Sequence, residues 1–232
     1  MGAQWKHAGR VAAGAAKGAL FTRLSKEITV AARGGDPNPV NNPRLRAALE
    51  AARKQSMTRE TIDRAIKRGA GLLDGNVQYE TLFFEGFTPH QVPIIVECLT
   101  DNKNRTAADI RVLFRKGQIG SVQWMFDRVG VIEASHPERA DGEEAAIEAG
   151  AQDVKIDAEN PEAGAEFICE TTDLDTVRKA LEAAGWLISS AEMAWVAKNP
   201  VTVDDDQRKE IEAWVNAIDE NDDVHRVYVA LG

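Results

Sequence analysis

The sequence predicts an α+β multi-domain protein, in which an N-terminal three-helix domain precedes two α/β domains of the ferredoxin-like type, the last inserted into the middle one. Two observations lead to this prediction. Apolar residues before position 70 recur at helical spacing, whereas from Tyr79 onward runs of aromatic and branched residues alternate with helical segments. Residues 129–199 then give the order strand, helix, strand, strand, helix, strand, which is typical of a split βαβ fold.

The N-terminal domain is predicted over residues 1–76, with three amphipathic helices. The first helix ends at Gly34-Gly35-Asp36-Pro37 and the third at Gly69-Ala70-Gly71, both typical helix C-termini. The second begins with Asn42 as its N-cap and Pro43 at the first helical position. Their apolar faces are formed by Leu20, Leu24, Ile28, Leu45, Leu49, Ala52, Ile62, Ala65 and Ile66.

The middle domain is predicted to be discontinuous, formed by residues 77–128 and 200–232. Thr106 with Asp109 fits a capping box that opens its first helix, and Thr202 with Asp205 fits one that opens its second. Its predicted strands are residues 79–87, 92–100, 121–126 and 224–231. Because the C-terminal helix and strand have no partners of their own, we expect them to pack on the earlier strands of this domain.

The third domain is predicted over residues 129–199 and lies between the two halves of the middle domain along the chain. Its predicted strands are residues 129–134, 152–156, 165–170 and 187–196, and its predicted helices are residues 138–149 and 173–184. This order of elements is the basis for the ferredoxin-like prediction.

The charges are sorted along the chain. Residues 1–70 contain 14 Lys or Arg and 5 Asp or Glu, a formal charge of +9, whereas residues 71–232 contain 14 and 32, a formal charge of −18. This asymmetry indicates a polyanionic partner for the basic part. The alternative is that these helices are merely basic on their solvated faces. The candidate nucleic-acid-binding residues are Arg23, Lys26, Arg44, Arg46, Arg53, Lys54, Arg64, Lys67, Arg68, Lys103 and Arg105.

A second basic segment, residues 103–116, lies within the acidic part and carries a local charge of +4. It follows the polar loop Asp101-Asn102-Lys103-Asn104, at the end of a predicted strand and just before a helix. A loop at a helix N-terminus is suited to phosphate, but a solvated helix face with a well-capped entry loop explains the same pattern. The sequence leaves both interpretations open.

No pattern of catalysis or metal binding is present. The four histidines are scattered singly, and the GxSxG, P-loop and GxGxxG motifs are missing. Cys98 and Cys169 lie in apolar runs and are expected to be buried thiols, while Asp204-Asp205-Asp206 sits where helix capping explains it. We therefore predict a protein that is not an enzyme, with no catalytic residue, metal, cofactor or small-molecule substrate.

No apolar run approaches the roughly 18 residues of a membrane span. The basic, Ala- and Gly-rich N-terminal segment also lacks the continuous apolar stretch of a secretory signal. We expect a cytoplasmic location and no membrane partner.

Several segments between residues 21 and 126 match one family closely. They are Phe21-Thr22-Arg23-Leu24, Gly35-Asp36-Pro37, Asn42-Pro43-Arg44-Leu45-Arg46, residues 62–71, 79–86 and 96–106, Gly120-Ser121-Val122 and Met125-Phe126. On these residues the chain resembles the YebC family, also called the PmpR or TACO1-like family. The resemblance implies three domains, the third inserted into the second. It also implies nucleic-acid binding, with phosphate contacts at Arg44, Arg46, Arg64, Lys67 and Arg68.

Two departures from the family pattern are visible. Residues 11–16 are apolar where the family usually carries more Lys and Arg, and Ala19 replaces a common base. The glycine-rich connection before Gly120 is shortened to Lys116-Gly117-Gln118-Ile119. The first departure affects the basic charge of the N-terminal segment. The second affects the conformation expected of the loop after the 103–116 segment.

Three hypotheses follow. The resemblance and the charge favour a DNA-binding regulator of transcription, in which the helical domain neutralises backbone phosphates. The first alternative is a translational activator that binds RNA or the ribosome through the same surface. The second is a protein-interaction module, whose basic helices pair with an acidic partner.

Overall fold

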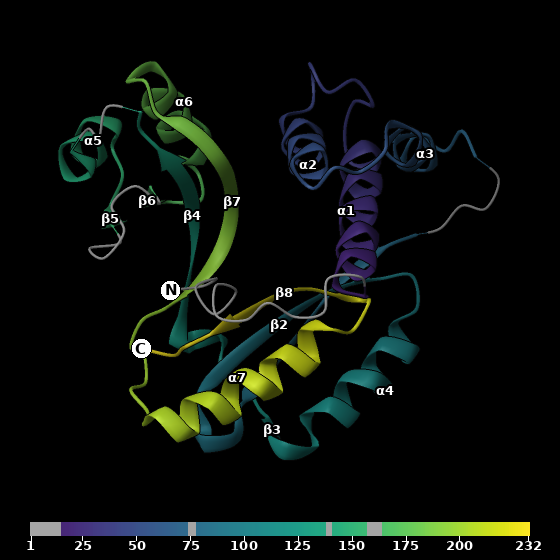
Figure 1. Cartoon of the computed structure of the whole chain (residues 1–232), viewed down its shortest axis with the longest axis vertical. Helices are drawn as coiled ribbons and strands as arrows, with labels where there is room; N and C mark the ends of the chain where they lie inside the picture. The colour runs from purple at the N-terminus through teal and green to yellow at the C-terminus, as the bar shows by residue number, and fades with distance from the viewer. Residues whose placement is uncertain (1–14, 74–77, 138–140, 157–163) are drawn as a thin grey trace. The chain divides into compact units, whose positions relative to one another are not determined.

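The computed structural model describes residues 15–73, 78–137, 141–156 and 164–232. The chain divides into two compact units, Met1–Met125 with Ala197–Gly232, and Phe126–Val196 (Figure 1). The first unit contains the three helices of the N-terminal region and an α/β part built from both ends of the sequence. The α+β fold class is as predicted, and the finer division at residues 76/77, 128/129 and 199/200 stays a prediction.

The helical part consists of α1 (Ala15–Arg33), α2 (Pro43–Lys54) and α3 (Arg59–Gly69), with α2 and α3 both packed against α1 (Figure 1). The Asn42 side chain accepts a 3.0 Å hydrogen bond from the Leu45 N–H, so the predicted start of α2 is confirmed. The buried core comprises Ile28, Ala31, Ala32, Leu45, Ala48, Leu49, Ala52, Met57, Ile62 and Ala65. The helical domain therefore has a hydrophobic core of its own.

The α/β part contains one sheet of four strands in the order β3-β1-β2-β8. Its strands are β1 (Glu80–Phe87), β2 (Pro93–Thr100), β3 (Gln118–Ile119) and β8 (Val224–Val229). Its helices are α4 (Lys103–Leu113) and α7 (Asp205–Asp219), with short 3-10 turns at Pro89–Gln91, Phe114–Lys116 and Gln123–Met125. Because β8 pairs antiparallel with β2, the expected packing of the C-terminal strand on the earlier strands is confirmed.

The C-terminal helix packs against the helix of the earlier segment. The Trp214 indole of α7 donates to the Leu113 carbonyl over 3.0 Å and meets the Phe114 ring edge-on at 5.2 Å. These contacts join two segments separated by about a hundred residues along the chain, and the inserted unit lies between them in the sequence.

The structure corrects three local predictions. Residues 121–125 are not a strand, because the Glu85 carboxylate accepts the N–H groups of Val122 and Gln123 (2.9 and 2.8 Å), and only Phe126 of the predicted strand lies in one. Asn102, and not Thr106, caps α4. Asp204, with Gln207 as its reciprocal partner, caps α7 in place of Thr202 and Asp205.

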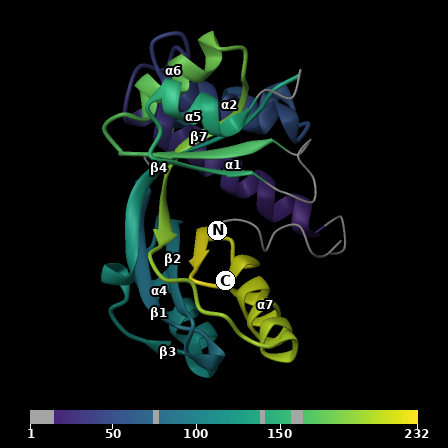
Figure 2. The same ribbon diagram turned by 90° about the vertical axis from the view of Figure 1, so that its left-hand side faces the viewer.

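The second unit contains one sheet in the order β5-β6-β4-β7. Its elements are β4 (Phe126–Ser135), α5 (Gly142–Ala149), β5 (Asp153–Ile156), β6 (Ala165–Cys169), α6 (Leu174–Ala183) and β7 (Leu187–Ala197). The strands β4 and β7 lie side by side (Figure 2). This strand order is the one expected of the predicted split βαβ arrangement.

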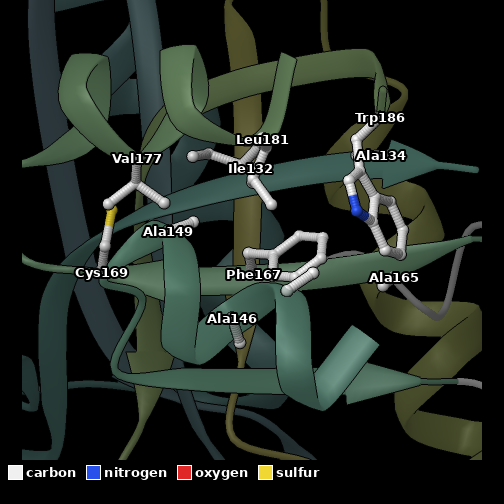
Figure 3. Packing of buried hydrophobic residues seen from close by; sticks show 11 residues of the cluster. Ile132, Ala134, Ala146, Ala149, Ala165, Phe167, Cys169, Val177, Leu181 and Trp186 are labelled. Carbon is white, nitrogen blue, oxygen red and sulfur yellow. The ribbon is translucent and has the colours of Figure 1, made fainter. Parts of the chain in front are cut away.

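The core of this unit lies between the sheet and the two helices. Phe167 and Trp186 meet edge-on at 4.9 Å, and Val177 and Leu181 of α6 belong to the same buried cluster, with Val177 next to Cys169 (Figure 3). Both cysteines of the chain are buried free thiols, as expected. Burial raises the pKa of Cys98 to about 12, so this thiol stays protonated.

Some sequence predictions lie outside the described residues. These are the N-terminal departure as far as residue 14, the connection at residues 74–77, and the start of the predicted 138–149 helix as far as residue 140.

Candidate nucleic-acid interface

The predicted phosphate contacts fall into two groups in the structure. One group lies on the exposed faces of α2 and α3. The other lies in the α/β part or where α1 contacts it, and each cation of this group has a carboxylate partner. The first group consists of Arg44, Arg46, Arg53, Lys54, Arg64, Lys67 and Arg68, and the second of Arg23, Lys26, Lys103 and Arg105.

On α3, Arg64, Lys67 and Arg68 are three and four residues apart and therefore share one helix face. All three are exposed, and Arg64 forms a 3.1 Å ion pair with Glu60 one turn earlier. Among the residues that the structure describes, Lys67 and Arg68 have no carboxylate partner. They lie in the last turn of the helix, where cations complement the helix dipole.

On α2, Arg46, Arg53 and Lys54 recur at a spacing of seven and eight residues and lie on one face. Arg46 donates to the carbonyls of Pro39 and Val40 at 3.2 and 2.8 Å, and both acceptors are uncharged. Arg53 is exposed, without a carboxylate partner in the described part of the chain. These side chains supply a second set of exposed cations.

Lys26 occupies a different environment. Only 9% of this residue is exposed, and its ammonium group donates to the Leu99 carbonyl (3.1 Å), the Asp222 carbonyl (2.8 Å) and the Asp223 carboxylate (2.8 Å). Three acceptors satisfy all three ammonium donors. Lys26 therefore attaches α1 to the end of β2 and to the turn before β8.

Asp223 is the centre of this junction and is 5% exposed. Besides Lys26, it accepts hydrogen bonds from the Arg105 guanidinium (2.9 Å) and the Thr106 hydroxyl (2.8 Å). Burial alone would raise the pKa of Asp223, but these hydrogen bonds outweigh burial and lower it. The carboxylate is therefore ionised and balanced by two cations.

Arg23 completes the group, with a 2.9 Å ion pair to Asp219 at the end of α7. We refer to Arg23, Lys26, Arg105, Asp219 and Asp223 as the clasp. Lys103 likewise pairs with Glu80, outside the clasp. Carboxylates of the α/β part thus pair with Arg23, Lys26, Lys103 and Arg105, and phosphate contacts at these four residues stay a prediction.

Glu27 forms a further contact between α1 and the α/β part. Its carboxylate lies 3.1 Å from His225 Nε2 on β8 and 3.0 Å from Arg44 Nε on α2. Burial alone would raise the pKa of Glu27, but the hydrogen bond with His225 and the charge of Arg44 lower it from 4.5 to about 2. Arg44 is consequently only partly available to a ligand.

Glu27 makes the protein acid-sensitive. Because its pKa is lower in the folded state, its stabilisation is complete above about pH 4.5 and is lost as the pH falls toward 2. Between about pH 5 and pH 3, the wild type should lose about 2 kcal/mol more unfolding free energy than Glu27→Gln. Urea titrations across this range measure the difference, and parallel pH profiles would contradict it.

Sequence reasoning missed the acidic half of the clasp. Asp219 and Asp223 lie 196 and 197 positions from Arg23 and Lys26. No local pattern distinguishes them from the other acids of the C-terminal region. The only signal in the sequence was that a basic segment and an acidic segment belong to one chain and could therefore pair.

Within the described residues, no group of three His, Cys, Asp or Glu side chains is placed to hold a metal ion. No helix in the described part of the chain has the length and apolar character to cross a membrane.

The sequence and structure were compared with known proteins. Residues 3–72 match the model of the TACO1/YebC protein N-terminal domain, and residues 79–231 match that of the TACO1/YebC second and third domain. A probable transcriptional regulatory protein of Pseudomonas fluorescens Pf0-1 is 53% identical over 100% of this chain and 99% of its own length. One of Bdellovibrio bacteriovorus is 48% identical over 100% of both.

A solved structure agrees with these matches. The crystal structure of a conserved hypothetical protein from Aquifex aeolicus superposes with a TM-score of 0.83 and 37% identity, covering 99% of this chain and 96% of the other. The names of the curated relatives indicate regulation rather than catalysis.

Proposed function

Because the chain belongs to the TACO1/YebC family, we propose that it is a transcriptional regulatory protein that binds DNA through the exposed cations of α2 and α3. The observation that carries the proposal is that Arg53, Lys67 and Arg68 are exposed and have no carboxylate partner within the described residues. The names of the curated relatives, probable transcriptional regulatory proteins, support a nucleic-acid partner in general.

The mechanism is neutralisation of backbone phosphates. Each Lys or Arg that contacts a phosphate releases condensed counterions, so affinity falls with salt at a logarithmic slope of about −0.9 per contact on duplex DNA. Arg53 and Lys54 lie in the last turn of α2, and Lys67 and Arg68 lie in the last turn of α3. There they can approach the backbone without a helix entering a groove, so this surface supplies affinity more than base specificity.

Charge reversal at Lys67 and Arg68 should reduce binding strongly. The double variant Lys67→Glu, Arg68→Glu is expected to bind a fluorescent duplex at least about tenfold more weakly, with a salt slope lower by about 2. Fluorescence anisotropy at several salt concentrations measures both quantities. The matched control is Lys179→Glu, Lys209→Glu, which makes the same change in net charge at exposed lysines of α6 and α7.

The alternatives give different results in the same assay. If the control weakens binding as much as the double variant, the effect is one of net charge and the assigned surface is wrong. Preference for single-stranded or ribosomal RNA, with co-migration with ribosomes in a sucrose gradient, would favour a translational role over DNA binding. Failure of the wild type to bind either polymer would favour a protein partner.

A further inference from the structure

The three cations of the clasp come from two helices and contact two carboxylates of the C-terminal segment. Arg23 and Lys26 lie three residues apart on one face of α1, and Arg105 lies in the first turn of α4. Their partners in the C-terminal segment are Asp219, the last residue of α7, and Asp223, just before β8, and Arg105 also pairs with Asp101 at 2.9 Å. The cations are thus gathered on one side and held by acids of the C-terminal segment.

The donors of this arrangement are of the kind that bind phosphate, and protein carboxylates occupy the position that a phosphate would take. Arg105 presents Nε and Nη2 to Asp223 at 3.3 and 2.9 Å, and Lys26 adds a third charged donor at 2.8 Å. Guanidinium and ammonium groups bind phosphate oxygens with the same hydrogen-bond geometry that they use for carboxylates. A phosphate that replaced either carboxylate would keep these charge-assisted bonds.

Arg23 carries a further sign of incomplete pairing. Its Nη1 donates to Asp219, but its buried Nε has no hydrogen-bond partner within the described residues. An unsatisfied buried donor costs free energy, because it has lost its water. Release of Arg23 to solvent or to a phosphate would remove that cost, so Arg23–Asp219 is the contact of the clasp that opens most easily.

We propose that Asp219 and Asp223 mask a second phosphate-binding surface, formed by Arg23, Lys26 and Arg105, and that the clasp is an autoinhibitory contact. Duplex DNA and the two carboxylates compete for the same cations. DNA bound to the exposed cations of α2 and α3 gains these contacts only when the clasp opens. The inference rests on the proposed function, because it assumes that the helical domain binds DNA.

The affinity for DNA then depends on how often the clasp is open. A ligand favours the open state only through contacts that the open state alone provides. Arg23 and Lys26, whose side chains are 13% and 11% exposed, are such contacts. Arg105 has a side chain that is 49% exposed, and opening of the clasp frees its hydrogen bonds from Asp223. If the open state is a minor one, the apparent dissociation constant is raised by the inverse of its population. A substitution that loosens the clasp but leaves these cations in place must therefore tighten DNA binding.

Asp219→Asn is the decisive variant, because it removes the charge that holds Arg23 and keeps the size of the side chain. It should bind a fluorescent duplex at least about threefold more tightly than the wild type, with a salt slope steeper by about 0.9. Asp206→Asn is the matched control. It makes the same charge change at the exposed start of the same helix. The double variant Asp219→Asn, Arg23→Gln should lose the gain.

Each outcome is decisive. If Asp219→Asn binds no more tightly than Asp206→Asn while the wild type binds DNA, the masking is overturned and the proposed function stands. If the double variant Asp219→Asn, Arg23→Gln binds DNA as tightly as Asp219→Asn alone, the tighter binding does not depend on Arg23. The masking is then also overturned. If none of these proteins binds DNA at low salt, the proposed function fails, and the inference fails with it. Thermal unfolding shows that each variant is folded at the assay temperature.

Discussion

Replacement of Gly69 by alanine is expected to destabilise the helical domain by about 3 kcal/mol. Gly69 is the last residue of α3 and lies directly on α1. A Cβ atom there would overlap the Thr29 carbonyl oxygen and lie 2.8 Å from the Ala32 Cβ. The carbonyl belongs to the helix backbone and cannot rotate away, so α1 and α3 must move apart.

The control for this substitution is in the same domain. Gly18 lies within α1, is exposed, and a Cβ there would meet no atom within 4 Å. Gly18→Ala should therefore stabilise the helix by up to about 1 kcal/mol, because alanine has the higher helix propensity. Urea unfolding followed by helical circular dichroism gives both values. A Gly69→Ala protein as stable as the wild type would show that the α1–α3 contact is looser than the structure has it.

Local signals explain why the helical domain could be predicted. The Asn42-Pro43 start of α2 and the Gly69-Ala70-Gly71 end of α3 act through backbone hydrogen bonds within a few residues. Gly71 indeed has a positive φ of 72°, the conformation that glycine adopts most easily. Such features depend little on the rest of the fold, and a single sequence reveals them.

The errors arose where distant residues replace a local interaction. Thr106 fits a capping box, but its hydroxyl is buried and donates to Asp223, 117 positions away. Residues 121–126 have the composition of a strand, but the Glu85 carboxylate takes two of their N–H groups. In both cases a tertiary contact overrides a reasonable local pattern, and one sequence contains no signal for it.

The same limit applies to the candidate site. Net charge points to the basic domain as the part most suited to a polyanion, and this stays a prediction. It could not separate Lys67 and Arg68, which are exposed, from Lys26, which is 9% exposed and neutralised by Asp223. That distinction depends on how α1 contacts the α/β part, which only the three-dimensional arrangement provides.

Removal of the Asp223 side chain should have the largest effect on stability. Asp223→Ala leaves Lys26 in its buried position without a counter-ion, and an uncompensated buried charge costs about 4 kcal/mol. Asp206→Ala, which breaks an exposed pair with Lys209, should change the unfolding free energy by no more than about 0.5 kcal/mol. Urea titration at neutral pH measures both variants.

A double-mutant cycle identifies the cause of that loss. Lys26→Met removes the buried ammonium, so the pair Lys26→Met, Asp223→Ala leaves no uncompensated charge on α1. The double variant should therefore be more stable than the sum of the two single effects predicts, by about 2 kcal/mol. Simple additivity would mean that Asp223 acts through Arg105 and Thr106 alone. In that case α4, and not α1, would be the element that the buried carboxylate stabilises.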